Sequence, residues 1–237
     1  MTGESRTTDR RRAVVLLSGG MDSATAAAEA REEGYAIHAL HTSYGQRTES
    51  KEHESARRLA EAFDAADFLH VETSHLLQIG GSSLTDESIE VGEADIESEE
   101  IPGTYVPFRN ANLLSMAVSY AEATGCSAVF VGAHSEDFSG YPDCRPEFFE
   151  AFERCVEVGT KPGTEIEIRV PFVESTKAEI AARGLDLGVP FEHTWSCYRA
   201  EEPACGTCDS CAFRLGAFQR LGVRDPISYT ERPRYAD

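Results

Sequence analysis

The stretch VVLLSGGMDSATAA occupies residues 14–27 and decides how the rest of the chain is interpreted. A short apolar run ends at Ser18, two glycines follow, and a small-residue helical pattern begins at once. This order predicts a strand, a tight turn and a helix, with glycines that let backbone N–H groups approach an anion closely. The first turn of the helix directs its N–H groups and its dipole at the same point. The stretch therefore predicts a phosphate-binding site.

Two well-known phosphate loops do not fit the hexamer SGGMDS within this stretch. The dinucleotide-binding fingerprint needs G-x-G-x-x-G, which is absent. The Walker loop needs a lysine after a glycine, yet none of Lys51, Lys161 and Lys177 follows one. Asp22 would repel a phosphate unless it caps the helix or binds a magnesium ion that neutralises both groups. The loop is therefore expected to hold a triphosphate without transferring its terminal phosphoryl group.

Strand patterns and helical patterns alternate along the chain. The strand patterns cover residues 13–18, 35–41, 67–72, 128–133 and 165–170. The helical patterns cover residues 23–33, 49–63, 110–124, 146–158, 176–183 and 210–220. Such alternation predicts an α/β fold with a parallel, Rossmann-like sheet and helices on both faces. The last strand pattern alternates apolar and charged residues, so it is expected at the sheet edge or outside the sheet.

The chain is expected to divide into a disordered tail over residues 1–12, a nucleotide-binding domain over 13–190 and a small C-terminal zinc-binding helical lobe over 191–237. Residues 73–104 break the alternation and carry eight acids between Asp86 and Glu100. A connection of this length predicts a functional loop or lid. A solvated acidic loop without a role is the alternative.

The charge of the chain is strongly acidic, with 41 Asp and Glu against 22 Lys and Arg and a net charge of −19. Such a surface opposes direct binding to nucleic acid or to an anionic membrane. Proteins of high-salt cytoplasms are also acidic and lysine-poor, so a halophilic source is favoured and the charge is weaker evidence against an RNA partner. No apolar run is long enough to span a membrane, and the polar start is unlike a secretory signal. A cytoplasmic protein is expected.

Four of the seven cysteines form a C-x7-C-x2-C-x2-C array made of Cys197, Cys205, Cys208 and Cys211. Four thiolates at this spacing satisfy tetrahedral Zn²⁺ in a closed structural site. A secreted disulfide framework would spread its cysteines more evenly along the chain. The array predicts a zinc ion that stabilises the C-terminal lobe, with an iron–sulfur cluster or a redox-active pair as alternatives.

Two middle segments place polar side chains where open parallel sheets bind ligands, beyond the carboxyl ends of their strands. Arg109 and Asn110 begin a predicted helix at this edge. The loop after residues 128–133 gathers His134, Glu136, Asp137, Tyr141, Asp143 and Arg145. Aspartate suits an amidine edge and arginine suits a carboxylate. Farther along, Thr176 and Lys177 begin a helix, which predicts a phosphate contact or else a solvated helix start.

The hexamer resembles the pyrophosphatase loop (PP-loop) of N-type ATP pyrophosphatases, which include asparagine, GMP and NAD synthetases and several RNA-thiolating enzymes. Those enzymes bind the triphosphate in this loop, adenylate an oxygen of the substrate and release pyrophosphate. From residue 13 onward the chain resembles one family closely, the 7-cyano-7-deazaguanine synthases. The motifs that carry this resemblance are SGGMDSATA, YGQR, SSLT, IPGTYVPFRN, SGYPDCRPEF, TKAEI, TWSCY and CGTCDSC.

This resemblance implies an adenine nucleotide alpha hydrolase-like fold and a reaction of 7-carboxy-7-deazaguanine, ammonia and ATP. The product would be 7-cyano-7-deazaguanine (preQ0), a precursor of deazapurine bases in tRNA, formed through an adenylated carboxylate and an adenylated amide. The resemblance further implies ATP, Mg²⁺ and Zn²⁺ as cofactors and a homodimer. The source of ammonia stays open, and so does the use of the product for archaeosine or queuosine.

The expected site residues follow from these motifs. ATP is expected at Leu17, Ser18, Gly19, Gly20, Met21, Asp22, Ser23, Ala24, Thr25, Ala26 and Ala27. The expected catalytic residues are Asp22, Ser23, Arg109, Asp137 and Lys177, and the expected substrate contacts are Arg109, Asn110, Asp137, Asp143 and Arg145. Two positions depart from the family's pattern. Met21 replaces the usual glutamine and is expected to point away from phosphate, and Phe108 replaces the usual glycine and can reshape the pocket.

Two other functions stay open at this point. A tRNA-thiolating ATP pyrophosphatase would pass sulfur through catalytic cysteines, so Cys→Ser changes in the array would stop chemistry and spare folding. A non-enzymatic zinc-binding adaptor with a degenerate nucleotide site would release no AMP. The glycine loop keeps all the polar groups that the chemistry requires, which favours an enzyme.

Overall fold

The computed structural model describes residues 11–86, 88–95, 101–134 and 141–236. Within them, five parallel strands form one sheet in the order β3-β2-β1-β4-β5. The strands are β1 (Arg12–Leu16), β2 (Ala36–Ser43), β3 (Asp67–Glu72), β4 (Ala128–Phe130) and β5 (Glu167–Arg169). The parallel order confirms the predicted fold class, and β5 takes the edge position that its alternating pattern allowed. The strands predicted over 13–18 and 128–133 both end earlier than expected.

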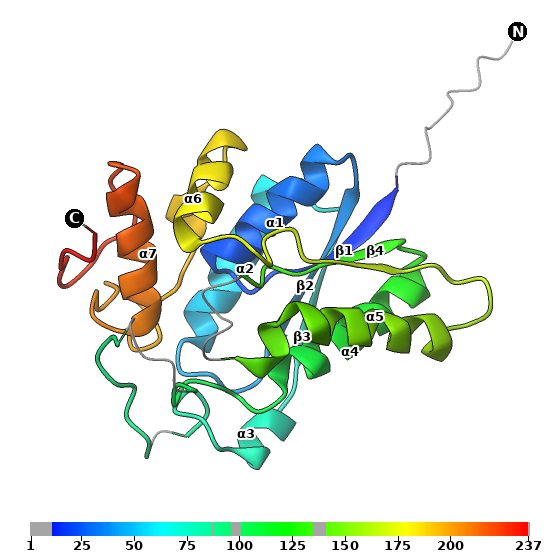
Figure 1. Cartoon of the computed structure of the whole chain (residues 1–237), viewed down its shortest axis with the longest axis horizontal. Helices are drawn as coiled ribbons and strands as arrows, with labels where there is room; N and C mark the ends of the chain where they lie inside the picture. The colour runs from blue at the N-terminus through cyan, green and yellow to red at the C-terminus, as the bar shows by residue number, and fades with distance from the viewer. Residues whose placement is uncertain (1–10, 87, 96–100, 135–140, 237) are drawn as a thin grey trace, which may run out of the picture.

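Helices cover both faces of this sheet (Figure 1). One face carries α1 and α2, with α6 against α1 and α7 against α6, and the other face carries α4 and α5. The helices are α1 (Met21–Glu32), α2 (Glu49–Ala62), α3 (His75–Ile79), α4 (Arg109–Thr124), α5 (Pro146–Gly159), α6 (Lys177–Asp186) and α7 (Asp209–Arg220). Each predicted helix is present within three residues of its expected ends, and the short α3 was not predicted. No described helix is both long and apolar enough to cross a membrane.

The central strands are buried on both faces, as their continuous apolar runs predict. Along β1, Ala13 and Val15 pack in the core beneath α1, whereas Val14 packs in the core beneath α4. Helix α1 lies between the sheet and α6, so small residues fill nearly all its sides. An added Cβ at Gly184 of α6 would lie 2.8 Å from Thr25 Oγ1 of α1. Small residues therefore bring these two helices close together.

The order of the strands determines where a ligand can bind. From β1 the chain builds outward through β2 and β3, and it then returns to the opposite side of β1 for β4 and β5. Open parallel sheets bind ligands outside the carboxyl ends of strands at such a reversal. Gly132 lies just after β4 at this point, and an added Cβ there would lie 2.6 Å from Ser23 N. Glycine thus lets the end of β4 approach the start of α1.

The described part of the acidic connection over 73–104 is fastened to the rest of the molecule. Arg47 donates hydrogen bonds to the carbonyl oxygens of Ser83 at 2.7 Å and Ile89 at 2.7 Å. Arg199 donates to the carbonyl oxygen of Val91 at 2.7 Å. Because these arginines bond to backbone oxygens, this part of the connection is more than a solvated acidic loop.

The predicted segment boundaries are only partly covered by the described residues. The predicted tail over 1–12 lies outside them except for its last two positions, and Arg12 already belongs to β1. The predicted lobe over 191–237 shares its core with the main domain, because Phe191 and Phe218 pack in the same cluster as α1. The boundary near residue 190 stays a prediction.

Candidate active site

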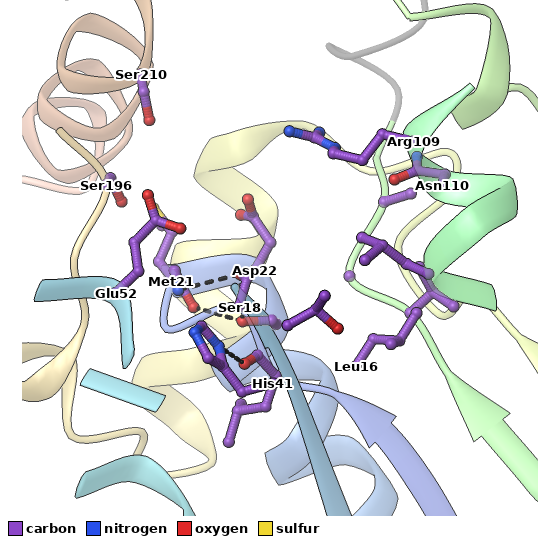
Figure 2. A pocket seen from close by; sticks show the side chains of 18 of the residues that line it. Leu16, Ser18, Met21, Asp22, His41, Glu52, Arg109, Asn110, Ser196 and Ser210 are labelled. Atoms are coloured by element: carbon purple, nitrogen blue, oxygen red, sulfur yellow. Dashed lines mark hydrogen bonds between the residues drawn. The ribbon is translucent and has the colours of Figure 1, made fainter. Parts of the chain in front are cut away.

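A cavity of about 230 Å³ opens at the carboxyl ends of β1, β2 and β4. Figure 2 shows Asp22 near its centre, Arg109 and Asn110 on one side, and Glu52 with Ser196 on the other. These side chains come from α1, α4, α2 and the segment before the cysteine array. The cavity therefore occupies the predicted ligand edge and draws on parts of the chain that are far apart in sequence.

The glycine loop between β1 and α1 forms the floor of this cavity. Gly19 has φ +92°, and an added Cβ would lie 2.5 Å from the carbonyl oxygen of Glu52, so no other residue fits there. Gly20 caps α1 without a side-chain hydrogen bond. Asp22 consequently lies in the first turn and does not cap the helix, which removes one of the two roles that the sequence left open.

Two serine hydroxyls hold the shape of this loop. Ser23 Oγ donates to the carbonyl oxygen of Gly20 at 3.0 Å and lies 3.0 Å from Ser18 Oγ. The N–H of Gly20 donates to Ser18 Oγ at 3.2 Å. From outside the loop, the N–H of Trp195 donates to the carbonyl oxygen of Gly19 at 2.8 Å. The loop is thus ordered by its own side chains and by a segment close to the cysteine array.

Three ionisable side chains from distant parts of the sequence meet beside the loop. Lys177 Nζ lies 2.6 Å from Asp22 Oδ2 and 2.8 Å from His134 Nε2. A lysine ammonium only donates, so His134 Nε2 accepts this hydrogen bond and its ring proton is assigned to Nδ1. Burial raises the pKa of Asp22, but attraction to Lys177 and His134 and the hydrogen bond from Lys177 together outweigh it, and the pKa lies below its usual value. Asp22 is therefore ionised at neutral pH.

The second carboxylate oxygen of Asp22 fits a bound cation. Asp22 Oδ1 is buried, and no described residue donates a hydrogen bond to it. A buried carboxylate oxygen without a partner is costly unless a ligand completes it. Hard divalent cations at nucleotide sites take one or two carboxylates together with phosphate oxygens. Asp22 at the floor of the cavity supplies this donor type.

A cationic wall stands opposite the loop. Arg109 Nη1 donates to Tyr44 Oη at 3.1 Å. Burial lowers the pKa of Arg109, but its tyrosine neighbours more than offset this and raise the pKa well above the usual value. The Asn110 N–H donates to Asp143 Oδ2 at 2.8 Å, and the Asn110 side chain donates to the Asp143 carbonyl oxygen at 2.9 Å. Asp143 thus fixes the start of α4, which carries Arg109.

The other predicted site residues are placed as follows. Asp137 lies outside the described residues. Arg145 is exposed at the start of α5 and does not line the cavity. Residues 24–27 are buried within α1 and do not line it either. Met21 lines the cavity but is 1% exposed and packs in the core beneath α1.

Phe108 stands outside the cavity lining, with 60% of its surface exposed. Its backbone is left-handed, with φ 56° and ψ 29°. Glycine adopts this conformation without strain, whereas phenylalanine does not. The ring makes an edge contact with Phe148, at a centroid distance of 6.1 Å. The residue therefore affects the backbone before α4 and does not contact the cavity.

Several residues of the cavity were not predicted as site residues. His134, which contacts Lys177 beside the cavity, had no predicted role either. Those with polar or aromatic side chains include His41, Tyr44, Glu52, Trp195, Ser196, Tyr198 and Ser210. Two of the motifs, YGQR and TWSCY, begin or lie among them and were the available signals. Neither motif indicates by itself which role its residues have, because that role depends on contacts made in the folded protein.

The cysteine array folds into one cluster. The four sulfur atoms all lie within 4.8 Å of one another, and three of the cysteines are buried while Cys205 is half-buried. Backbone N–H groups of Ala200 and Cys205 donate to Cys197 Sγ at 3.3 and 3.4 Å, and the N–H of Cys208 donates to Cys205 Sγ at 3.4 Å. Such N–H···S bonds orient metal-binding sulfurs. The donor set and its closed surroundings can bind a metal ion.

Comparisons with known proteins identify the family of the chain. The family model for queuosine biosynthesis protein QueC matches residues 12–222. The 7-cyano-7-deazaguanine synthase of Haloarcula marismortui is 69% identical over 231 residues, covering 97% of this chain and 100% of that protein. The synthase of Halobacterium salinarum strain R1 is 70% identical and covers 95% and 98%, and that of Chlorobium phaeobacteroides is 54% identical and covers 94% and 99%.

Among solved structures, NMN synthetase from Francisella tularensis is 16% identical with a TM-score of 0.47, covering 91% of this chain and 74% of that one. This likeness is too weak to support an argument. The family model and the relatives span nearly the whole chain, and two of the relatives come from halophilic archaea. The predicted family is confirmed: the chain belongs to the QueC family, together with the 7-cyano-7-deazaguanine synthases that it resembles.

Proposed function

We propose that the protein converts 7-carboxy-7-deazaguanine, ammonia and two ATP into 7-cyano-7-deazaguanine, two AMP and two pyrophosphate. One observation carries this proposal: a single cavity joins the glycine loop, with its Asp22–Lys177 pair, to Arg109 on the opposite wall. An enzyme that adenylates a carboxylate needs an anion site for the triphosphate and a cationic group for the carboxylate within reach of each other. The names of the relatives support the choice of substrate.

The first step joins the substrate carboxylate to AMP. A carboxylate oxygen is a poor leaving group, and adenylation lets it depart as part of AMP. The triphosphate would lie on the N–H groups of the first turn of α1. Lys177 would neutralise the departing pyrophosphate, and its bond to Asp22 keeps it beside the loop. Mg²⁺ held by Asp22 would supply charge neutralisation at the phosphates.

Substrate orientation depends on the wall around α4. Arg109 is the proposed partner of the substrate carboxylate, because a guanidinium binds a carboxylate through two parallel hydrogen bonds. Asn110 also lines the cavity, and Asp143 is proposed to act through it by fixing the start of α4. Asp137 and Arg145 stay proposed substrate contacts. Asp137 suits the amidine edge of the deazaguanine, and Arg145 would have to turn inward from its exposed position.

The later steps replace oxygen by nitrogen. Ammonia attacks the adenylated carboxyl carbon, AMP leaves, and the amide forms. A second ATP adenylates the amide oxygen, and loss of AMP and a proton then leaves the nitrile. Apolar cavity residues such as Leu16, Leu113 and Val131 would limit hydrolysis of both adenylates by keeping water away.

Further properties belong to the same proposal. We infer that the cysteine cluster holds Zn²⁺ as a structural ion, because four cysteine ligands leave no open position for chemistry. The protein is proposed to be a cytoplasmic homodimer that acts on a small molecule and does not bind nucleic acid directly. The halophilic relatives favour archaeosine over queuosine as the use of the product.

Mass spectrometry of a reaction containing 7-carboxy-7-deazaguanine, ATP, Mg²⁺ and ammonium in high salt tests this function. The expected result is transient amide, accumulating nitrile, and two AMP for each nitrile formed. Failure to form either amide or nitrile would overturn the proposal. A parallel reaction with tRNA and a sulfur donor tests the thiolating alternative, for which no thiolated tRNA is expected.

A further inference from the structure

A second carboxylate enters the cavity without a place in the proposed chemistry. Glu52, from the first turn of α2, extends into the cavity on the side away from Arg109, near Ser196 (Figure 2). ATP and the substrate carboxylate are both anions, so a carboxylate beside them is unfavourable unless something positive binds there. Asp22 already has Lys177 as its cationic partner. Within the described residues, Glu52 forms no hydrogen bond or ion pair with a cationic side chain, which leaves its charge to be explained.

Glu52 is held in a fixed orientation. Thr48 Oγ1 donates to Glu52 Oε1 at 2.7 Å, and Gln46 Nε2 donates to Glu52 Oε2 at 3.1 Å. Both donors belong to the turn that follows β2, so each carboxylate oxygen is fixed and keeps further lone pairs. The arrangement is that of a positioned acceptor and not of a solvated surface acid.

Arg109, the proposed partner of the substrate carboxylate, is among the charged groups that influence Glu52. Burial raises the pKa of Glu52, opposed by the two hydrogen bonds and by the charge of Arg109 on α4, while Glu49 on its own helix raises it further. Tyr44, from the turn after β2, accepts a hydrogen bond from Arg109. Burial raises the pKa of Tyr44, the charge of Arg109 lowers it and the charge of Glu52 raises it. Glu52, Tyr44 and Arg109 all line the same cavity, and Arg109 is hydrogen-bonded to Tyr44.

We propose that Glu52 forms the subsite that binds the nitrogen nucleophile as an ammonium ion, with two hydroxyl oxygens as further acceptors: that of Ser210, and that of Ser196, which also accepts a hydrogen bond from Arg214 Nη1 at 3.4 Å. Ammonium carries four N–H donors and no acceptor, so it needs a carboxylate and neutral oxygens around it. Both hydroxyls line the same cavity as Glu52. This inference rests on the proposed function and names the place of its second substrate.

The subsite also supplies the base that the reaction needs. Ammonium transfers one proton to the Glu52 carboxylate, which leaves ammonia with a free lone pair. That lone pair forms the C–N bond at the adenylated carboxyl carbon held by Arg109, and the C–O bond to AMP breaks with its electron pair on AMP. The second proton lost from nitrogen and the proton on Glu52 pass to water. The products are the amide, AMP and two protons.

Glu52→Gln separates this role from all others, because the first adenylation needs no nitrogen. Three rates are compared in purified wild type and variant: ATP–pyrophosphate exchange with 7-carboxy-7-deazaguanine, amide formation with ammonium, and hydroxamate formation with hydroxylamine. Hydroxylamine is uncharged near neutral pH and needs no base to expose its lone pair. The variant should keep exchange and hydroxamate formation within about twofold and lose at least about 100-fold in ammonium-dependent amide formation.

The other outcomes overturn the subsite. Loss of exchange together with a greater Mg²⁺ requirement would make Glu52 a ligand of the nucleotide or its cation. An equal fall in the rates of amide and hydroxamate formation would mean that Glu52 only holds the turn at Gln46 and Thr48. An unchanged rate of ammonium-dependent amide formation would mean that Glu52 has no role in binding ammonium. Absence of exchange in the wild type would remove the proposed function and the subsite together. Glu61→Gln, on the exposed end of the same helix, is the matched control, with thermal melts for all variants.

Discussion

The glycine loop and the cysteine cluster are both short motifs, but their polar groups find their partners in different parts of the chain. The cysteine cluster draws all four sulfurs and most of its N–H···S bonds from residues 197–211. The glycine loop leaves Asp22 to be completed by Lys177, which lies 155 positions away along the chain. A motif satisfied by its own segment is suited to stabilising structure, whereas one left open toward a cavity is suited to chemistry.

The two regions nevertheless touch. The segment before Cys197 carries Trp195, whose N–H bonds to the carbonyl oxygen of Gly19 in the loop. Arg214 of α7 is fully buried and holds this segment by donating to Thr194 Oγ1 at 2.7 Å. Burial lowers the pKa of Arg214, but the Asp225 carboxylate outweighs it and raises the pKa above its usual value. The structural region therefore supports one wall of the chemical one.

Asp22→Asn should have the largest effect and should act on chemistry alone. The amide keeps the shape of the side chain but loses the charge that holds Lys177 and a cation, so AMP formation should fall about 1,000-fold. The far-UV circular dichroism spectrum should be unchanged. Glu32→Gln, at the exposed end of the same helix, is the control and should retain full activity. Near-normal AMP formation by Asp22→Asn would show that the loop does not carry the chemistry.

Cys208→Ser should act on structure first. Removing one of four ligands is expected to release the metal ion and to lower the melting temperature by about 10 °C, since structural metal sites contribute directly to folding. Metal content and thermal melts measure both effects, with the exposed Cys155→Ser as the control. Lost activity with metal and melting temperature retained would reverse the comparison and favour sulfur transfer by the cysteines.

The free energy of unfolding should depend on pH through the protonation of His41. The Nδ1 atom of His41 is hydrogen-bonded to the carbonyl oxygen of Leu17 at the start of the loop. Burial lowers the pKa of His41 from 6.5 to about 4. His41 therefore becomes protonated below pH 6.5 in the unfolded chain, but only near pH 4 in the folded chain. Stability is complete above this window and falls by about 3 kcal/mol across it as the pH is lowered.

Denaturant melts of wild type and His41→Asn between these pH values measure this dependence. The variant should lose the additional slope, and the exposed His75→Asn should keep it. Identical slopes in wild type and His41→Asn would mean that His41 is protonated in the folded protein.

Phe108 should have the smallest effect. Phe108→Gly removes strain of about 1 kcal/mol in the left-handed backbone but loses the contact with Phe148, so stability should change by less than about 1 kcal/mol. Because the side chain does not line the cavity, kcat/KM should stay within about twofold. A larger kinetic change would restore the expectation that Phe108 shapes the pocket.

The sequence by itself determined the features that arise from neighbouring residues. The alternation of apolar runs and helical patterns predicted the parallel sheet with covered faces, because side-chain periodicity reflects local geometry and burial. The hexamer predicted the anion loop, and the cysteine spacing predicted the metal-binding cluster, since each places its own groups within a few residues. The sum of the motifs identified the family.

Only the tertiary structure decided which distant residues complete the site. The hexamer has no lysine, and the strand order brings Lys177 and His134 to Asp22. The same packing places Glu52 in the cavity, although it was not a predicted site residue. It leaves Arg145, a predicted substrate contact, outside the cavity lining. Such contacts depend on how strands and helices cross after long intervals of sequence. Local sequence patterns extend over only a few residues, so they do not predict which distant side chains meet in the site.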